Sequence, residues 1–190
     1  KENDKLSEKL ENLINKENKD NQLAELDYLE RVVTTGSTTT YLKIAEGCSN
    51  KCTYCAIPNI RGPYISRPFE EIIEEAKSLA SKGYKEIIVI AQDTTKYGID
   101  LYEKPRLAEL LDEISKIESI KWLRFLYAYP EGITDELIQT VKNNPKICKY
   151  FDIPIQHISN NLLKIKNRKT TPEKIEIIVM IINKVIPEVV

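Results

Sequence analysis

Apolar and polar residues alternate along this chain with two periods, which together predict a succession of strands and helices. Short apolar runs predict four buried strands, at residues 41–45, 86–91, 122–129 and 150–155. Apolar residues at helical spacing predict helices at residues 69–80, 107–117 and 134–141, with two more helices after the fourth strand. This alternation of strands and helices predicts an α/β fold.

The ends of these helices are marked by residues that suit helix termini. Pro68 suits the first turn of the first helix, and Gly83 follows that helix where a left-handed stop is favoured. Thr134 is expected to cap the third helix, and Thr171 followed by Pro172 opens the last one. Helices of this length between strands imply right-handed crossovers, so we expect parallel strands that are buried on both faces.

The number of strand and helix units limits the architecture. Four units are few for a closed barrel, so we expect either an open doubly wound sheet or part of a barrel. Residues 187–190, Pro-Glu-Val-Val, resemble the approach to a fifth strand. The chain is therefore expected to be part of a larger protein.

The first 39 residues differ in composition from the rest. Apolar residues at helical spacing predict an amphipathic surface helix, formed by Leu6, Leu10, Leu13 and Ile14. Two stretches lack the apolar spacing of a helix: the polar run at residues 15–22 and the Thr-rich stretch at residues 34–40. We therefore divide the chain into a leading segment, residues 1–39, and a core, residues 40–190.

Charge and composition exclude several classes of protein. The 190 residues include 28 basic and 29 acidic side chains, and a net charge of -1 gives no global field that would hold DNA or another polyanion. No apolar run approaches the roughly 18 residues of a membrane-spanning helix. The first five residues, Lys-Glu-Asn-Asp-Lys, lack the apolar stretch of a signal peptide, so a cytoplasmic location is expected.

Three of the four cysteines lie within one short loop, a spacing that suits a metal centre better than disulfides. Cys48, Cys52 and Cys55 form a CxxxCxxC pattern after the first predicted strand. Thiolates are soft ligands, and three on one loop can hold three irons of a cubane cluster while the fourth iron stays open to substrate. The alternative is a structural zinc completed by Cys148 or His157, because structural zinc takes four ligands. Cys148 is otherwise expected to be a small buried residue away from the site.

Polar clusters follow the other predicted strands at their carboxyl ends, where parallel sheets bind ligands. They comprise Gln92 to Thr95 after the second strand, Tyr129 to Glu131 after the third, and Gln156 with His157 after the fourth. We expect the fold to bring these residues and the cysteine loop to one mouth. Each has a simpler explanation on its own, because Asp93 and the threonines suit turns and the single histidine suits a structural hydrogen bond.

The cysteine loop, with Tyr54 before its last cysteine, resembles the motif of the radical S-adenosylmethionine (SAM) superfamily. Three stretches are more narrowly similar to the RimO-type methylthiotransferases: residues 41–48, residues 60–68 with Ile-Arg-Gly and Ser-Arg-Pro, and residues 91–98 with Ala-Gln-Asp-Thr and Tyr-Gly. The resemblance implies a parallel (βα) partial TIM-type barrel, truncated after about four units. It also implies that residues 1–39 belong to a preceding methylthiotransferase domain.

The resemblance implies a [4Fe-4S] cluster held by Cys48, Cys52 and Cys55, whose open iron binds the amino and carboxylate groups of S-adenosyl-L-methionine. The implied cofactor-binding side chains are Tyr54, Gln92, Asp93, Gln156 and Arg168, with Arg168 a candidate for the cofactor carboxylate. Electron transfer from the reduced cluster then cleaves SAM to a 5′-deoxyadenosyl radical, which abstracts hydrogen from an unactivated carbon. No catalytic residue is assigned beyond the cluster ligands.

For this family the implied reaction adds a methylthio group to the β-carbon of an aspartate in small-subunit ribosomal protein twelve. Flavodoxin or ferredoxin is the expected electron donor. The family also implies a second [4Fe-4S] cluster in its amino-terminal domain, but the sequence has no second cysteine triplet, so this chain alone is not expected to complete the reaction.

Three alternatives remain open from the sequence. One is a tRNA-adenosine methylthiotransferase, although that family tends to have Gly-Gln-Asn where this chain has Ala-Gln-Asp at residues 91–93. The second is another radical SAM enzyme with an unrelated substrate. The third is a non-catalytic interaction module in which a metal only staples the loop.

Overall fold

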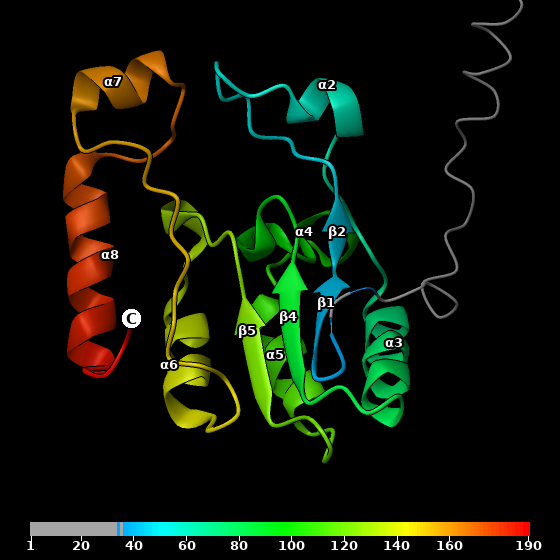
Figure 1. The fold of residues 1–190 in the computed structure, drawn as a ribbon. Helices are drawn as coiled ribbons and strands as arrows, with labels where there is room; N and C mark the ends of the chain where they lie inside the picture. Colours follow the sequence, from blue (N-terminus) through cyan, green and yellow to red (C-terminus); the bar gives the residue numbers. More distant parts are fainter. Residues whose placement is uncertain (1–33, 35) are drawn as a thin grey trace, which may run out of the picture. The chain divides into compact units, whose positions relative to one another are not determined.

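The computed structural model describes residue 34 and residues 36–190, and Figure 1 shows how their elements are arranged. The amphipathic helix predicted around Leu6 to Ile14 lies outside these residues, and the division of the chain at residue 39 stays a prediction. The main sheet has three parallel strands in the order β1-β4-β5, which are β1 (Thr39–Lys43), β4 (Glu86–Ile90) and β5 (Trp122–Phe125).

Helices follow the strands, as the sequence predicts. The longer ones are α3 (Phe69–Ser81), α5 (Leu107–Ser115), α6 (Asp135–Asn143) and α8 (Pro172–Val185). Short elements that the sequence did not predict are α2 (Ile57–Arg61), α4 (Ile99–Tyr102), and the 3-10 turns η1 (Thr94–Lys96) and η2 (Pro130–Gly132). The first of the two closing helices is α7 (Asn160–Ile165), and a small antiparallel pair joins β2 (Ala45–Glu46) to β3 (Ile65–Ser66).

Helices cover one face of the main sheet. Leu42, Val89 and Phe125 point to this face and are fully buried, and the helices that follow the strands are neighbours in the order α3, α5, α6 and α8 (Figure 1). On the other face Tyr41 is 40% exposed and Arg124 is only partly buried. The prediction that both faces are buried is therefore wrong for the described residues, because the helices line only the outside, as in the wall of a barrel.

The predicted helix ends are confirmed by their hydrogen bonds. The Thr134 hydroxyl accepts from the N–H of Leu137 at 3.2 Å, and the Thr171 hydroxyl accepts from the N–H of Lys174 at 3.4 Å. Gly83 follows α3 with φ +100°, a conformation that only glycine adopts readily. These residues explain why α3, α6 and α8 begin or end where the sequence predicts.

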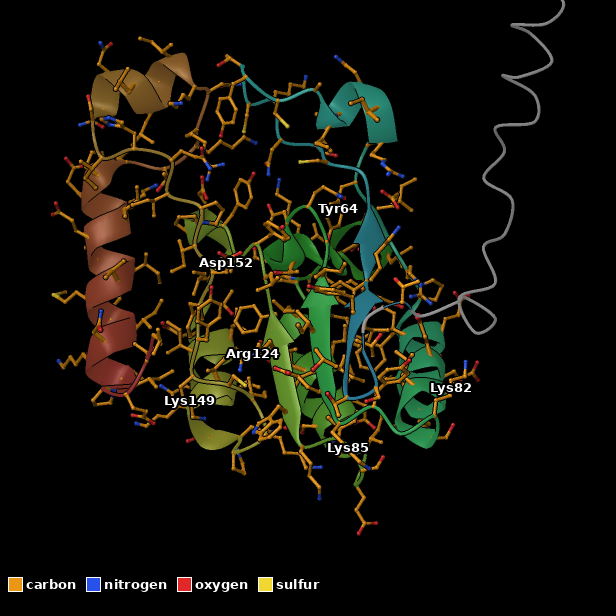
Figure 2. The ribbon with its side chains drawn as sticks, viewed as in Figure 1. Tyr64, Lys82, Lys85, Arg124, Lys149 and Asp152 are labelled. Atoms are coloured by element: carbon orange, nitrogen blue, oxygen red, sulfur yellow. The ribbon has the colours of Figure 1, made fainter. Side chains whose placement is uncertain are left out.

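The predicted fourth strand is wrong for the described residues. The segment runs beside β5, where Leu123 and Ile147 form one isolated parallel bridge and the N–H of Ala128 donates to the carbonyl of Asp152 at 2.8 Å. No ladder develops because Tyr127 has φ +58° and donates its N–H to the carboxylate of Asp152, labelled in Figure 2, at 2.9 Å. The same turn of the backbone ends β5 earlier than predicted, so the described sheet has three parallel strands and not four.

The end of the chain lies beside this segment. The N–H of Val190 donates to the carbonyl of Lys149 at 2.9 Å, and the N–H of Phe151 donates to the carbonyl of Val190 at 3.1 Å. This pair of bonds has the pattern of parallel strands, in agreement with the predicted approach to a further strand. Within the described part of the chain, no helix combines the length and the apolar character needed to cross a membrane.

Candidate functional site

The cysteine loop starts just after β2, beyond the carboxyl end of β1, and Gly47 lets the chain turn there. Gly47 has φ +71°, and a Cβ at this position would lie 2.0 Å from the carbonyl oxygen of Pro63. The N–H of Cys48 donates to the carbonyl of Gly62 at 3.1 Å, which ties the start of the loop to the segment before β3. The position of the first cysteine is thus fixed by backbone geometry.

All three cysteines of the loop are free thiols. Cys48 and Cys52 are buried, with exposed fractions of 6% and 8%, and Cys55 is half-buried. Burial raises the pKa of the Cys48 thiol, although a hydrogen bond from the N–H of Asn50, at 3.4 Å from the sulfur, opposes this effect. The buried thiols need a positive partner to be stable as thiolates.

A cavity of about 410 Å³ opens beside this loop on the uncovered side of the sheet. Residues from β1, β2, β4 and the cysteine loop line it, among them Lys43, Ala45, Cys48, Cys55, Ile90, Gln92 and Tyr129. The Gln92 side-chain oxygen is buried and has no hydrogen-bond partner among the described residues. An unpaired buried amide oxygen costs about 1–3 kcal/mol, so it indicates a place where a ligand donates a hydrogen bond.

Asp93, the next residue, is engaged by the protein itself. Its carboxylate is 1% exposed and accepts hydrogen bonds from the Asn50 amide at 3.1 Å and the Thr95 hydroxyl at 2.6 Å. The ammonium of Lys96 lies 3.8 Å from the carboxylate and also donates to the Asn50 side-chain oxygen. Asp93 therefore connects the end of β4 to the cysteine loop, and it lines a second, smaller cavity of about 260 Å³ instead of the cavity beside Cys48.

Arg168 lies against the loop from the other end of the sequence. Its guanidinium donates to the Cys52 sulfur at 3.8 Å and to the carbonyl of Pro154 at 2.8 Å, and it stacks on Tyr129 with 4.1 Å between its central carbon and the ring centre. Burial disfavours the charge, yet the hydrogen bonds with Tyr129 and Cys52 raise the pKa of Arg168 above its ordinary value. Burial also raises the pKa of the Tyr129 hydroxyl to about 12, so this hydroxyl stays protonated at neutral pH.

The structure separates Gln156 from these residues, whereas the Tyr54 hydroxyl interacts with both Cys52 and Arg168 but does not line the large cavity. Tyr54 is 50% exposed and packs under the ammonium of Lys166, 4.7 Å from the ring centre. Gln156 is exposed, has φ +66°, and does not belong to the lining of either cavity. The predicted site residues that the structure brings together at the large cavity are thus Cys48, Cys55 and Gln92, with Cys52, Arg168 and Tyr54 beside it.

The donor set fits an iron–sulfur cluster better than a single ion. Among the described residues, no three His, Cys, Asp or Glu side chains are placed to coordinate one metal ion. Cys148 has Glu86 and Arg124 as charged neighbours, at the amino ends of the strands, and the exposed His157 accepts at Nδ1 from a backbone N–H at 2.9 Å. The closed zinc site predicted as an alternative is therefore not formed, whereas a cluster binds each thiolate to a separate iron and needs no common point.

Two further residues that the sequence did not single out contribute to the site, Asn50 and Asn167. Asn50 bridges the loop to Asp93, and Asn167 donates from its side chain to the carbonyl of Lys51 at 2.6 Å. Tyr129, which the sequence analysis expected at the mouth from its place after the third predicted strand, lines the cavity. No sequence signal points to Asn50 or Asn167, because their partners are known only once the chain is folded.

Comparison with known proteins assigns this arrangement to a family. The family model described as "Radical SAM superfamily" matches residues 42–190, which include the whole cysteine loop and all described helices. The chain belongs to the radical SAM superfamily. The similarity of this radical SAM chain to curated relatives extends over most of its length.

Three relatives carry the same description, ribosomal protein uS12 methylthiotransferase RimO. The chain is 59% identical over 181 residues to that of Alkaliphilus oremlandii (strain OhILAs), covering 95% of this chain and 41% of the relative. It is 59% identical over 162 residues to that of Clostridioides difficile (strain 630), covering 85% and 36%. It is 62% identical over 148 residues to that of Caldanaerobacter subterraneus subsp. tengcongensis, covering 78% and 34%. This radical SAM chain thus spans about two fifths, or less, of the relatives' length.

Solved structures agree with the fold. The radical S-adenosylmethionine methyltransferase TsrM from Kitasatospora setae, solved with tryptophan substrate and a SAM analogue, matches with a TM-score of 0.60 and 18% identity, over 78% of this chain and 28% of TsrM. The cobalamin-dependent SAM radical enzyme OxsB, solved with aqua-cobalamin and S-adenosylmethionine, matches with a TM-score of 0.59 and 15% identity, over 75% of this chain and 22% of OxsB. At these identities the matches show a shared fold alone.

Proposed function

We propose that this chain is the radical SAM core of a methylthiotransferase that acts on ribosomal protein uS12. The observation that carries the proposal is the cavity lined by Cys48, Cys55 and Gln92, beside which the third thiol, Cys52, contacts a buried arginine. Identities of 59–62% to proteins described as uS12 methylthiotransferases support the choice of substrate over a tRNA adenosine. The proposed target is the β-carbon of an aspartate in uS12.

Cys48, Cys52 and Cys55 would hold three irons of a [4Fe-4S] cluster. The fourth iron then has no protein ligand and is left for SAM. When bound, the reduced cluster and SAM together supply radical chemistry. The residues of this chain hold the thiols in place, orient the cofactor and exclude water from the buried side of the loop, where Cys48 and Cys52 are less than a tenth exposed.

Gln92 is the proposed cofactor contact with the strongest support. Its unpaired buried oxygen is suited to accept a hydrogen bond from the ammonium group of SAM. Arg168 has an unpaired buried Nε that is suited to a carboxylate oxygen, while its two terminal nitrogens already have partners. Asp93 is proposed to act on the cofactor only through Asn50 and the loop. Tyr54 and Gln156 need a change of position to reach the large cavity, so they stay predictions from the family pattern.

The complete reaction needs more than this chain. Its sequence has four cysteines, three of them in the loop, so a second cluster would have to be held by a preceding domain of the kind that the RimO-type family has. We propose that the chain alone, supplied with electrons by a flavodoxin, a ferredoxin or a chemical reductant, cleaves SAM without methylthiolating uS12.

Product analysis tests this proposal. The 190-residue chain is reconstituted anaerobically with iron and sulfide, given SAM and dithionite, and assayed for 5′-deoxyadenosine and methionine. We expect both products from the unmodified chain and from Cys148→Ala, and neither from Cys52→Ala. A folded chain with a full complement of iron and sulfide that releases no 5′-deoxyadenosine would contradict the proposal, and methylthiolation of uS12 by the chain alone would contradict the need for a second cluster.

A further inference from the structure

Residues 165–168, which begin at the last residue of α7 and are called the clasp here, bind the cysteine loop from more than a hundred residues away. The Thr53 hydroxyl donates to the carbonyl of Ile165 at 2.9 Å, its N–H donates to the carbonyl of Lys166 at 3.3 Å, and the Asn167 amide donates to the carbonyl of Lys51 at 2.6 Å. Figure 1 shows α2, which follows the cysteine loop, and α7, which precedes the clasp, at the same end of the sheet. The clasp thus fixes the middle of the loop, where Cys52 lies.

Arg168 is the last residue of the clasp, and it places a buried positive charge beside the sulfur of Cys52. The side chain is 7% exposed, and the Tyr129 ring and the Pro154 carbonyl hold two other sides of the guanidinium in place. Among the described residues, no carboxylate lies within ion-pair distance of Arg168, and Glu131, the acidic group that interacts with it, is exposed. A buried cation without a carboxylate needs another polar partner, and the Cys52 sulfur, 3.8 Å from Nη1, is the partner in reach.

We propose that Arg168 is a positioning residue that raises the reduction potential of the cluster bound through Cys52. This inference rests on the proposed function, since it needs the cluster. Reduction adds one electron, taken from an external one-electron donor, to a cluster that is already anionic, and no bond forms or breaks at Arg168. An N–H donated to a ligand sulfur and a fixed positive charge beside it both stabilise the reduced form more than the oxidised form.

The geometry favours this role over the binding of a cofactor carboxylate. Arginine binds a carboxylate most strongly through two parallel N–H bonds. In Arg168 the two terminal nitrogens are engaged by Cys52 and Pro154, which leaves Nε as the one nitrogen without a partner. A carboxylate bound in the bidentate fork would have to share a terminal nitrogen with Cys52 or Pro154, whereas the contact with Cys52 is already formed.

A redox titration tests the proposal. Arg168→Met removes the charge and keeps a side chain of similar length, and Lys164→Met, at an exposed position of α7, is the matched control for the loss of one positive charge. Both variants and the unmodified chain are reconstituted, checked for iron and sulfide content, and titrated with a low-potential reductant while the reduced cluster is followed by electron paramagnetic resonance. We expect the equilibrium constant for reduction to fall at least tenfold in Arg168→Met, a shift of about 59 mV to more negative potential for a one-electron couple, and to stay unchanged in Lys164→Met.

The outcomes separate this inference from the proposed function. A full cluster in Arg168→Met with an unchanged potential overturns the inference, and a weaker affinity for SAM in that variant at unchanged potential assigns Arg168 to the cofactor instead. If Arg168→Met does not retain the cluster, Arg168→Lys is titrated instead, because it keeps the charge but loses the directed N–H. We expect its reduction potential to shift in the same direction by a smaller amount, and an unchanged potential would contradict the proposal. Failure of the unmodified chain to bind any cluster would instead contradict the proposed function.

Discussion

Asp93 illustrates how a buried carboxylate supports a site through its contacts with the protein. The carboxylate is held by Asn50 and Thr95 and faces the ammonium of Lys96, so it links the end of β4 to the loop that carries Cys48 and Cys52. In the structure Asp93 supports the loop, and its role toward the cofactor stays a prediction.

Replacing this carboxylate tests the network. We expect Asp93→Asn to lower the free energy of unfolding by about 1–3 kcal/mol, because the asparagine side chain removes the charge that faces Lys96 and puts an N–H group where Asn50 or Thr95 donates. Denaturant unfolding measures the change. Glu131→Gln, at an exposed position beside the same small cavity, is the control and should have little effect. Equal stability of Asp93→Asn and the unmodified chain would show that the network contributes nothing.

Gly47 is a second residue that its surroundings require, because only glycine leaves room for the neighbouring backbone of Pro63. Gly47 and Gly62 both have positive φ, but a Cβ on Gly62 meets no atom within 4 Å, whereas a Cβ on Gly47 would overlap Pro63. We expect Gly62→Ala to lower the free energy of unfolding by only about 1–3 kcal/mol, the cost of its positive φ, and to bind a full cluster. Gly47→Ala should also lose most of its iron, as measured by iron content after reconstitution. Full iron content in Gly47→Ala would mean that Pro63 moves without affecting Cys48.

The sequence predicts part of the site and not all of it, for identifiable reasons. The cysteine loop and Gln92 follow strands that form as predicted, so their position at the carboxyl end of the sheet was predictable. Gln156 follows a strand that does not form, and its left-handed backbone turns its side chain to solvent. The contacts of Asn50 and Asn167 join residues more than 40 apart in sequence, which no local pattern encodes.

At the scale of elements, helices are predicted better than strands. Apolar periodicity and capping residues locate α3, α5, α6 and α8 to within two residues at most ends. β2 and β3 have two residues each, too few to produce a pattern. The pairing between the chain after β5 and the segment beside it is interrupted at Tyr127. Whether such short segments pair as strands depends on which element lies beside them, and the sequence does not reveal that neighbour directly.

A half-buried lysine completes the end of α6. The ammonium of Lys149, labelled beside α6 in Figure 2, donates to the carbonyls of Lys142 and Asn144, each at 3.0 Å, and to that of Val141. Burial lowers the pKa of Lys149, which indicates that the amine is held in a partly desolvated place by these carbonyls. The negative end of the helix dipole favours a cation there.

Lys149→Met should destabilise the chain by about 1–3 kcal/mol, because three carbonyls lose a charged donor. Thermal or denaturant unfolding measures the difference. Lys142→Met, in the exposed last turn of the same helix, is the matched control and should cost only about 0.3–1 kcal/mol. If the two variants are equally stable, the three hydrogen bonds of Lys149 do not contribute beyond its charge.

The clasp gives a prediction for the dynamics of the cysteine loop. Asn167 has φ +53°, a left-handed conformation that glycine adopts without strain. Asn167→Gly therefore removes only the hydrogen bond to Lys51, whereas Asn167→Ala also adds about 1–2 kcal/mol of backbone strain. We expect amide hydrogen exchange in residues 48–55 to become faster in both variants, and more so in Asn167→Ala. Asn161→Ala, exposed in α7, is the control. Unchanged exchange in all three variants would show that the clasp does not restrain the loop.

At the scale of the whole molecule, three parallel strands covered by helices on one side carry the thiols and the cavity at one end. The uncovered face of the sheet holds the cavity beside Cys48 and Cys55, so a cofactor bound there lies between the loop and the sheet. The fold is shared with TsrM and OxsB, of which the chain covers 28% and 22%. The central claim is that the loop holds a cluster with one iron open to SAM.

Electron paramagnetic resonance of the reconstituted, reduced chain tests that claim most directly, with spectra recorded before and after addition of SAM and with Cys52→Ala as control. A cluster whose open iron binds the cofactor predicts a signal that changes when SAM is added, and no such signal in Cys52→Ala. A folded chain that holds tetrahedral zinc and forms no cluster, or a cluster signal that is indifferent to SAM, would contradict it.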